Sequence, residues 1–455
     1  MTGVALTRVL AEFVAGHRGE TMPAAVGQEA TRAIADCIGA AMAGRSEPVA
    51  GIVSAQAAGE TGPCVLWGHG ATTTARNAAL INGCVAHAHA IDDTHESMRG
   101  HPSVPVVPAV FAVADEIGAG GAQRLSAYAV GVEVAAKLGR AVNDRHAQIG
   151  WHTTCTLGSV GAAAAAAHLL GLDAHRTAHA LGMAASMAGG LRVNFGTMTK
   201  PLHAGLAAHN GVLAARLAAG GMTASPVALE GGEGFLDLFC GAVHSRPERA
   251  VESLGQPYEL LQPGIVYKLY PTCSLMHALI DLVLDAVAGG HIERHDVAQV
   301  RCRISRRLEA ARGKRWPAGG MEAKFHVEYC VGVALAYGRQ ALGDFSDASV
   351  HDPLLRPWAD RILVEVGDDF PADNGDFAEV IVTHRTRPEF RARQAKPRGH
   401  PSLPLSAAEH AGKFVRCAQP LLGEARARNL HETLMQMPAL TADDLRRALA
   451  LDSQP

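Results

Sequence analysis

The chain contains the stretch WHTTCTLGSVGAAAAAAHLLGL at residues 151–172, in which most positions are alanine, glycine or another small residue. Small and apolar residues recur there at three- and four-residue spacing, as in an α-helix. Alanine has the highest helix propensity, and small side chains let helices approach closely. The most apolar part, residues 158–172, is interrupted by His168 and is too short to span a bilayer. The stretch therefore predicts a closely packed helix of a globular domain.

The same spacing covers most of the chain up to about residue 260, with glycine or proline between the runs. One short β-like piece, PCVLWG at 63–68, interrupts it. The helical runs are 31–44, 74–90, 107–118, 125–142, 158–171, 173–190 and 205–221.

The pattern changes after about residue 264. Helices are predicted over 274–288 and 323–337, and strands over 297–305, 360–366 and 377–386. This region is expected to form two helices against a short antiparallel sheet, followed by a basic, proline-containing linker or loop at 391–404. From residue 406 the pattern is helical again. We predict a mostly α fold, with a helical domain from 1–264 and 400–455 and a smaller α+β domain from 265–399.

Composition narrows the functional class. The 455 residues carry a net charge of −3, so no global basic field attracts nucleic acid or membrane. The nine cysteines include no Cys-x-x-Cys pair, which argues against a zinc ribbon and against the usual local iron–sulfur spacing. Unpaired thiols and an N-terminal stretch typical of an amphipathic helix, not of a signal peptide, favour a soluble cytoplasmic protein. No phosphate-binding, dinucleotide-binding or nucleophile-elbow motif is found.

A dense polar segment, HAHAIDDTHESMRGHPS, spans residues 87–103. Burial of so many polar groups without partners is costly, so a cleft is one interpretation. A metal site is a second, but His87 and His89 are two residues apart and point to different faces of a helix. A capped helix end with a solvated polar loop is a third.

Three further segments each allow two interpretations. In 150–158 His152 precedes a helix start that could receive a carboxylate, or that Thr154 or Thr156 merely caps. Residues 191–205 contain Arg192, Lys200 and His203, which lie either on a loop that binds a carboxylate or on a solvated loop. In 267–277 the spacing of Cys273 and His277 allows a thiolate–imidazole pair or a buried structural cysteine.

Together these segments resemble the PrpD/MmgE family along nearly the whole chain. The resemblance is carried by 81–95 with 101–103, 151–172, 196–221 with 228–235, 268–281, 322–338 and 398–414. Family activities include 2-methylcitrate dehydratase, cis-aconitate decarboxylase and iminodisuccinate epimerase. The resemblance implies a large helical domain built from both chain ends, a smaller α+β lid and a homodimer. It also implies no metal and no organic cofactor.

The resemblance also implies the site residues. Those expected to line an interdomain pocket are Thr94, His101, His152, Lys200, Lys268 and Tyr329, and further substrate-binding candidates are Asp93, Arg192, His203 and Cys273. The chain has Ala90 where the family often has aspartate, and Cys273 where the decarboxylase branch has histidine. The loop from Thr94 to His101 is one residue longer than in that branch.

These residue types suit carbanion chemistry next to a carboxylate. Lys200 and Lys268 are the expected anchors, and a histidine (His101 or His152) has the intrinsic pKa of a base near pH 7, with a desolvated lysine as the rival base. Tyr329 and Thr94 are expected to orient the substrate or to donate to a leaving hydroxyl. We predict a cofactor-free lyase of the 2-methylcitrate dehydratase type acting on a small polycarboxylate. The alternatives are an epimerase, a decarboxylase, a metal-dependent hydrolase and a silent binding protein.

Overall fold

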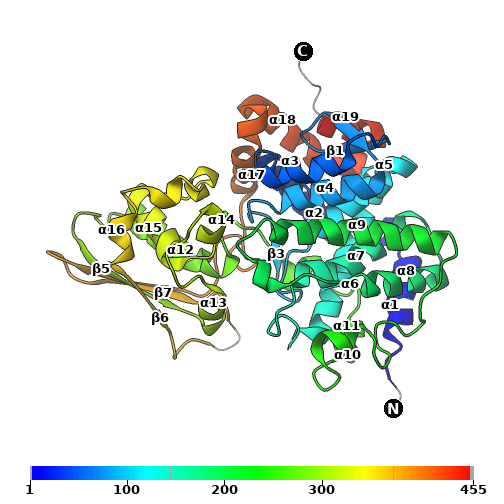
Figure 1. The fold of residues 1–455 in the computed structure, drawn as a ribbon, viewed down its shortest axis with the longest axis horizontal. Helices are drawn as coiled ribbons and strands as arrows, with labels where there is room; N and C mark the ends of the chain where they lie inside the picture. The colour runs from blue at the N-terminus through cyan, green and yellow to red at the C-terminus, as the bar shows by residue number, and fades with distance from the viewer. Residues whose placement is uncertain (1–2, 144, 372–373, 451–455) are drawn as a thin grey trace.

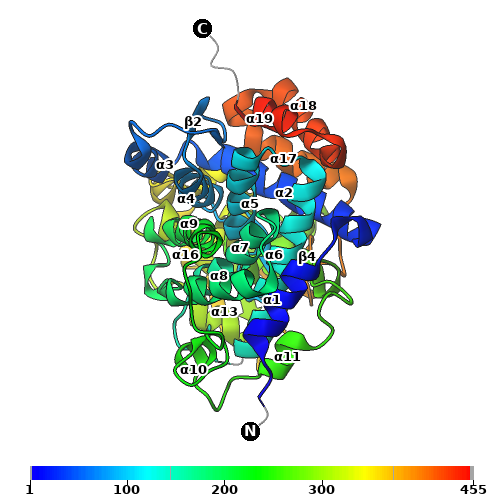
Figure 2. The same ribbon diagram turned by 90° about the vertical axis from the view of Figure 1, so that its right-hand side faces the viewer.

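The computed structural model describes residues 3–143, 145–371 and 374–450. Its larger part is helical and is built from both ends of the chain (Figures 1 and 2). The helices of the N-terminal portion are α1 (Leu6–Gly16), α2 (Ala24–Gly44), α3 (Pro48–Ser54), α4 (Ala75–Ala86), α5 (Ser103–Ile117), α6 (Gly121–Val142), α7 (Thr153–Leu169), α8 (Ala174–Ser186), α9 (Thr199–Ala219), α10 (Phe235–Cys240) and α11 (Pro247–Val251). The C-terminal helices are α17 (Ala407–Leu422), α18 (Glu424–Met435) and α19 (Ala442–Ala450). Helices α17 and α18 pack on α2, and α19 packs on α5.

Helix α7, the run of small residues, lies among α5, α6, α8 and α9 (Figure 2). Where α6 crosses α7, a Cβ on Gly161 would lie 2.7 Å from the carbonyl oxygen of Gly131. Only glycine permits this approach of two backbones. The small residues of α7 therefore allow this helix and α6 to pack closely, and close packing of α7 is what the sequence predicts.

Short strands connect this helical body. β1 (Cys64–Leu66), which the sequence predicts, pairs with β2 (Ala71–Thr73), and β3 (Thr94–His95) pairs with β4 (Ile265–Val266). The β3–β4 pair joins two segments that are far apart in sequence, with Thr94 opposite Val266 and His95 opposite Ile265.

The smaller α+β part lies beside this body (Figure 1). Its helices are α12 (His277–Ala288), α13 (Arg306–Ala311), α14 (Gly320–Ala323), α15 (Val327–Tyr337) and α16 (Arg356–Ala359). Its strands are β5 (Val297–Ile304), β6 (Ile362–Val366), β7 (Ala378–His384) and β8 (Phe390–Gln394), in the order β6-β5-β7-β8. The mostly α fold with a smaller α+β part is confirmed. The domain boundaries at 264 and 400 stay a prediction.

Three expectations for this part were wrong. The sheet is mixed, because the long crossover through α13–α16 returns β6 parallel to β5. Strand β8 occupies the start of the expected 391–404 loop; Arg393 Nε lies 2.7 Å from Glu379 on β7, which explains why a basic segment joins the sheet. The helix expected over 323–337 breaks at His326, whose imidazole accepts the Tyr329 backbone N–H and caps α15.

The helical body and the α+β part each have a hydrophobic cluster. The first cluster takes residues from Leu6 to Tyr267 and from Leu405 to Leu449, and the second takes residues from Tyr270 to Val382. No helix among the described residues is long and apolar enough to cross a membrane.

Candidate active site

A cavity of about 600 Å³ is lined by residues of both parts of the chain. The predicted site residues that line it are Thr94, His101, His152, Arg192, Lys200, Lys268 and Cys273. Arg307, Ala310 and Ala311 of α13 also line it. The structure therefore brings side chains from five separate segments to one cavity.

Local structure explains these placements. The β3–β4 pairing sets Thr94 opposite Val266, two residues before Lys268. Lys200 lies in the first turn of α9, where Pro201 is tolerated because the first helical N–H groups have no partner within the helix. His152 is the N-cap residue of α7, with its backbone N–H donating to Gly190.

Asp92 is the buried centre of the histidine cluster. Its Oδ2 lies 2.9 Å from Nδ1 of His87 and 2.8 Å from Nδ1 of His101. Nδ1 of His101 also lies 2.8 Å from the Asp93 carbonyl oxygen. Because these oxygens only accept, both Nδ1 atoms carry the proton and both Nε2 atoms carry a lone pair. Nε2 of His87 accepts from Lys200 Nζ at 2.6 Å, so the lone pair of His101 is the one at the cavity.

Burial keeps these imidazoles neutral. It lowers the pKa of His101 to about 4, although Asp92 opposes the shift. Burial and the neighbouring Lys200 hold the pKa of His152 well below its usual value. Both rings are therefore available to accept a proton at neutral pH.

Two buried lysines, Lys200 and Lys268, also line the cavity. Burial lowers the pKa of Lys200 to about 7, against the attraction of Asp92. Burial likewise lowers the pKa of Lys268, whose Nζ donates to the carbonyl oxygen of Ala90. Because burial removes water from these two lysines, an anion that enters the cavity would stabilise their protonated form.

His152 is the second imidazole at the cavity. Its Nδ1 lies 3.0 Å from Nδ1 of His203, one turn after Lys200 on α9, and Phe195 packs edge-on against its ring. Its Nε2 is buried and has no hydrogen-bond partner within the described parts of the chain. An unpartnered buried nitrogen beside a cavity is suited to a ligand.

Neither predicted capping threonine caps α7, whose N-cap residue is His152. Thr154 Oγ1 accepts from the backbone N–H of His101 at 3.1 Å, and Thr156 Oγ1 lies 2.7 Å from Nε2 of His146. Thr153 Oγ1 donates to the Arg99 carbonyl oxygen at 2.8 Å, so Thr153 and Thr154 tie the start of α7 to the segment that carries His101.

Three predicted site residues do not line the cavity. Tyr329 is fully buried in the α+β part, where its hydroxyl donates to the Asp344 carbonyl oxygen at 2.6 Å. Asp93 accepts from Ser103 Oγ at 2.5 Å, and burial raises its pKa to about 8. His203 contacts His152 instead. The side chain of Tyr329 lies in the hydrophobic cluster of the α+β part and not in the cavity, so its contact with substrate stays a prediction.

The structure adds residues that sequence reasoning did not assign. Asp92 and His87 lay within the noted polar segment, but only folding shows that Asp92 joins two imidazoles. Arg307, an exposed residue of α13, had no signal in the sequence. Burial raises the pKa of Cys273, which argues for a thiol rather than a thiolate paired with His277.

His87, Asp92 and His101 also offer ligand atoms within 4.8 Å of one another. The donor set fits a cation poorly, because Lys200 Nζ already lies on His87 and both Nδ1 atoms already donate to the one carboxylate.

Comparison with known proteins identifies the family of the chain. Residues 8–247 match the MmgE/PrpD N-terminal domain and residues 270–436 match the MmgE/PrpD C-terminal domain. Human cis-aconitate decarboxylase is 29% identical over 76% of this chain and 73% of its own length. Cis-aconitate decarboxylase of Aspergillus terreus is 26% identical over 84% and 82%, and a cis-aconitate decarboxylase-like protein of Aspergillus oryzae is 24% identical over 98% and 97%. The chain belongs to the MmgE/PrpD family.

Proposed function

We propose that the protein is a lyase that removes a proton next to a carboxylate of a small di- or tricarboxylate and eliminates water, in the manner of 2-methylcitrate dehydratase. The family and the relatives indicate the lyase class. One observation carries the finer proposal: a neutral imidazole oriented by Asp92 shares a cavity with two buried lysines.

The lysines supply binding and stabilise the transition state. Proton removal at carbon places negative charge on the adjacent carboxylate oxygens. Lys200, Lys268 and Arg192 line the cavity and can hold these oxygens with charge-assisted hydrogen bonds. Because the side chains of Lys200 and Lys268 are buried, these interactions are stronger than they would be in water.

His101 is the proposed base. Its Nε2 lone pair accepts the proton from carbon, and Asp92, which contacts Nδ1, stabilises the resulting imidazolium. Lys200, with its pKa near 7, gives a proton to the departing hydroxyl. One C–H bond and one C–O bond break, a C=C bond forms, and water leaves. Thr94 orients the substrate in this scheme.

Decarboxylation of a tricarboxylate is the second candidate, because the curated relatives carry that name. Decarboxylation requires the same cationic groups and a proton donor, but no base. Lys200 alone could donate the proton. Cys273, which lines the cavity, stands where that branch has histidine, and this difference favours elimination over decarboxylation. An epimerase would instead use His101 and His152 as two bases.

Proton NMR in deuterium oxide separates these reactions. The protein is incubated with citrate, 2-methylcitrate, cis-aconitate and iminodisuccinate, each also tested with His101→Asn and Lys200→Ala variants. Elimination gives a new vinylic proton signal from citrate and replaces the methyl doublet of 2-methylcitrate with a methyl singlet on the double bond, whereas decarboxylation gives a product one carboxylate smaller and epimerisation only deuterium at carbon. Elimination lost in both variants supports the proposal. Turnover that both variants retain, or no turnover with any substrate, would refute it.

A further inference from the structure

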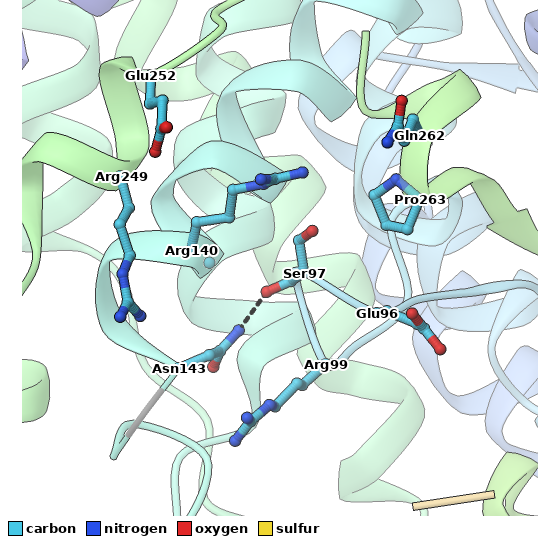
Figure 3. Close-up of a pocket in the computed structure, with 10 residues that line it drawn as sticks. Glu96, Ser97, Arg99, Arg140, Asn143, Arg249, Glu252, Gln262 and Pro263 are labelled. Carbon is cyan, nitrogen blue, oxygen red and sulfur yellow. Dashed lines mark hydrogen bonds between the residues drawn. The ribbon is translucent and has the colours of Figure 1, made fainter. Parts of the chain in front are cut away.

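The loop 94–101 delivers both Thr94 and His101 to the cavity, yet much of its anchoring lies on the opposite side. A second, polar cavity of about 560 Å³ is lined there by Ser97, Arg140 and Asn143, among others (Figure 3). Residues of the loop therefore line both spaces, so contacts on the side away from the candidate site can also affect the position of His101.

The backbone of this loop is also strained. Arg99 adopts a left-handed conformation with φ 48°, which costs free energy for a residue with a Cβ. Residues in such conformations keep them only where surrounding contacts hold them.

Glu259, which no part of the proposed reaction uses, supplies such contacts. Its side chain is fully buried, and its Oε2 accepts from Ser97 Oγ at 2.8 Å. Its backbone carbonyl oxygen lies 3.0 Å from Nε2 of His95. The same residue therefore holds the loop at two points, one in strand β3 and one beyond it.

The carboxylate of Glu259 is itself fixed by helix α6. Its Oε1 lies 2.5 Å from Arg140 Nε and 3.3 Å from Lys137 Nζ. Its backbone N–H donates to Glu133 Oε2 at 2.6 Å. Two cations beside a carboxylate that is removed from water favour this one position of the Glu259 side chain.

Helix α6 also contacts the loop directly. Asn143 Nδ2 donates to the Ser97 carbonyl oxygen at 2.6 Å (Figure 3). A Cβ on Gly139 would lie 2.4 Å from that same oxygen, so the loop backbone rests on the helix. Ser97 is thus the point where Glu259 and α6 meet the loop.

We propose that Glu259 is a positioning residue for the reaction, acting through Ser97 and His95 to fix the loop that ends at His101. This rests on the proposed function, since it assigns His101 as the base. Lys200 and Lys268, which bind the anion, lie outside the loop, and Thr94 is held by its pairing with Val266. Loosening the segment between Thr94 and His101 should therefore lower kcat while leaving KM within about twofold.

The test uses Glu259→Gln, which keeps the shape and an acceptor but removes the charge. We expect kcat to fall at least tenfold. Ser97→Ala should lower kcat about threefold, and Ser97→Thr, which keeps the hydroxyl, should restore it. Glu230→Gln is the matched control: that carboxylate accepts from Thr7 N–H and Oγ1, away from the loop, and its removal should leave kcat unchanged.

Amide hydrogen exchange measured by mass spectrometry gives a readout independent of turnover. Exchange over 94–101 should rise in Glu259→Gln and Ser97→Ala, but not in Glu230→Gln. Unchanged exchange in this loop, or a loss confined to KM, would overturn the positioning role. If Glu259→Gln fails to fold, the two Ser97 variants decide. If the wild-type protein turns over no polycarboxylate, the proposed function fails, while exchange still decides whether Glu259 holds the loop.

Discussion

Replacing Asp92 with asparagine probes the centre of the candidate site with little change of shape. The asparagine oxygen can still accept from one imidazole, but the negative charge is lost. In the wild-type protein the Asp92 carboxylate contacts Nδ1 of His87 and of His101 at 2.9 and 2.8 Å. It also raises the pKa of Lys200 against the effect of burial.

The magnitude follows from the charge that develops at His101. When His101 takes a proton, an imidazolium forms beside a carboxylate, with charge centres about 4 Å apart. At an effective dielectric constant of about 20 this attraction is about 4 kcal/mol. Its loss from the transition state corresponds to about a 10³-fold fall in kcat. Lys200 should also lose its proton at lower pH, so KM at pH 7 should rise.

Steady-state kinetics of Asp92→Asn between pH 4 and 9 measures both effects. We expect kcat to fall 10²- to 10⁴-fold. The basic limb of the kcat/KM profile should also move to lower pH than in the wild-type protein. A kcat within threefold of wild type with an unmoved basic limb would refute the assignment of Asp92 and His101.

Asp93→Asn is the matched control, because the neighbouring carboxyl is equally buried. Burial and the nearby Asp36 raise the pKa of Asp93 to about 8, so at pH 7 it is mostly protonated. Asparagine can replace its hydrogen bonds to Ser103 without loss of charge. This variant should keep kcat within about threefold of wild type.

The remaining predictions concern the pH dependence of kcat/KM, the packing of helix glycines, the Tyr329 hydroxyl and the effect of a chelator. In the wild-type protein kcat/KM should rise as pH passes about 4, where His101 becomes neutral, and fall as pH passes about 7, where Lys200 loses its proton; a pH-independent profile from 4 to 9 would contradict this. Gly205→Ala should lower the free energy of unfolding by about 1–3 kcal/mol in urea titrations, because its Cβ would lie 2.2 Å from a carbonyl oxygen, whereas Gly51→Ala, in open space on α3, should raise it by about 0.5–1 kcal/mol. Tyr329→Phe should cost about 1 kcal/mol of stability and leave kcat/KM unchanged, and a large kinetic loss would restore Tyr329 to the site. Prolonged dialysis against a chelator should leave turnover unchanged, while loss that zinc or manganese restores would favour a metal-dependent enzyme.

Local patterns in the sequence were enough to predict the mostly helical fold. The alanine- and glycine-rich run of α7 predicts a helix that packs closely, since helix propensity and side-chain size are local properties, but it does not predict that α6 is a partner. The family resemblance identified Lys200, His101 and His152 as site candidates, and all three line the cavity. The homodimer and the cytoplasmic location stay predictions.

Tertiary structure decided the rest, because the decisive contacts join residues far apart in the chain. The parallel pairing of β5 with β6 depends on a crossover, and the inward turn of Tyr329 depends on packing around Phe345. The bond of Lys200 to His87 spans 113 positions and that of Ser97 to Glu259 spans 162. Periodicity reports only on residues within a few turns of each other, so which imidazole keeps a free lone pair, and what holds its loop, becomes defined only when the chain has folded.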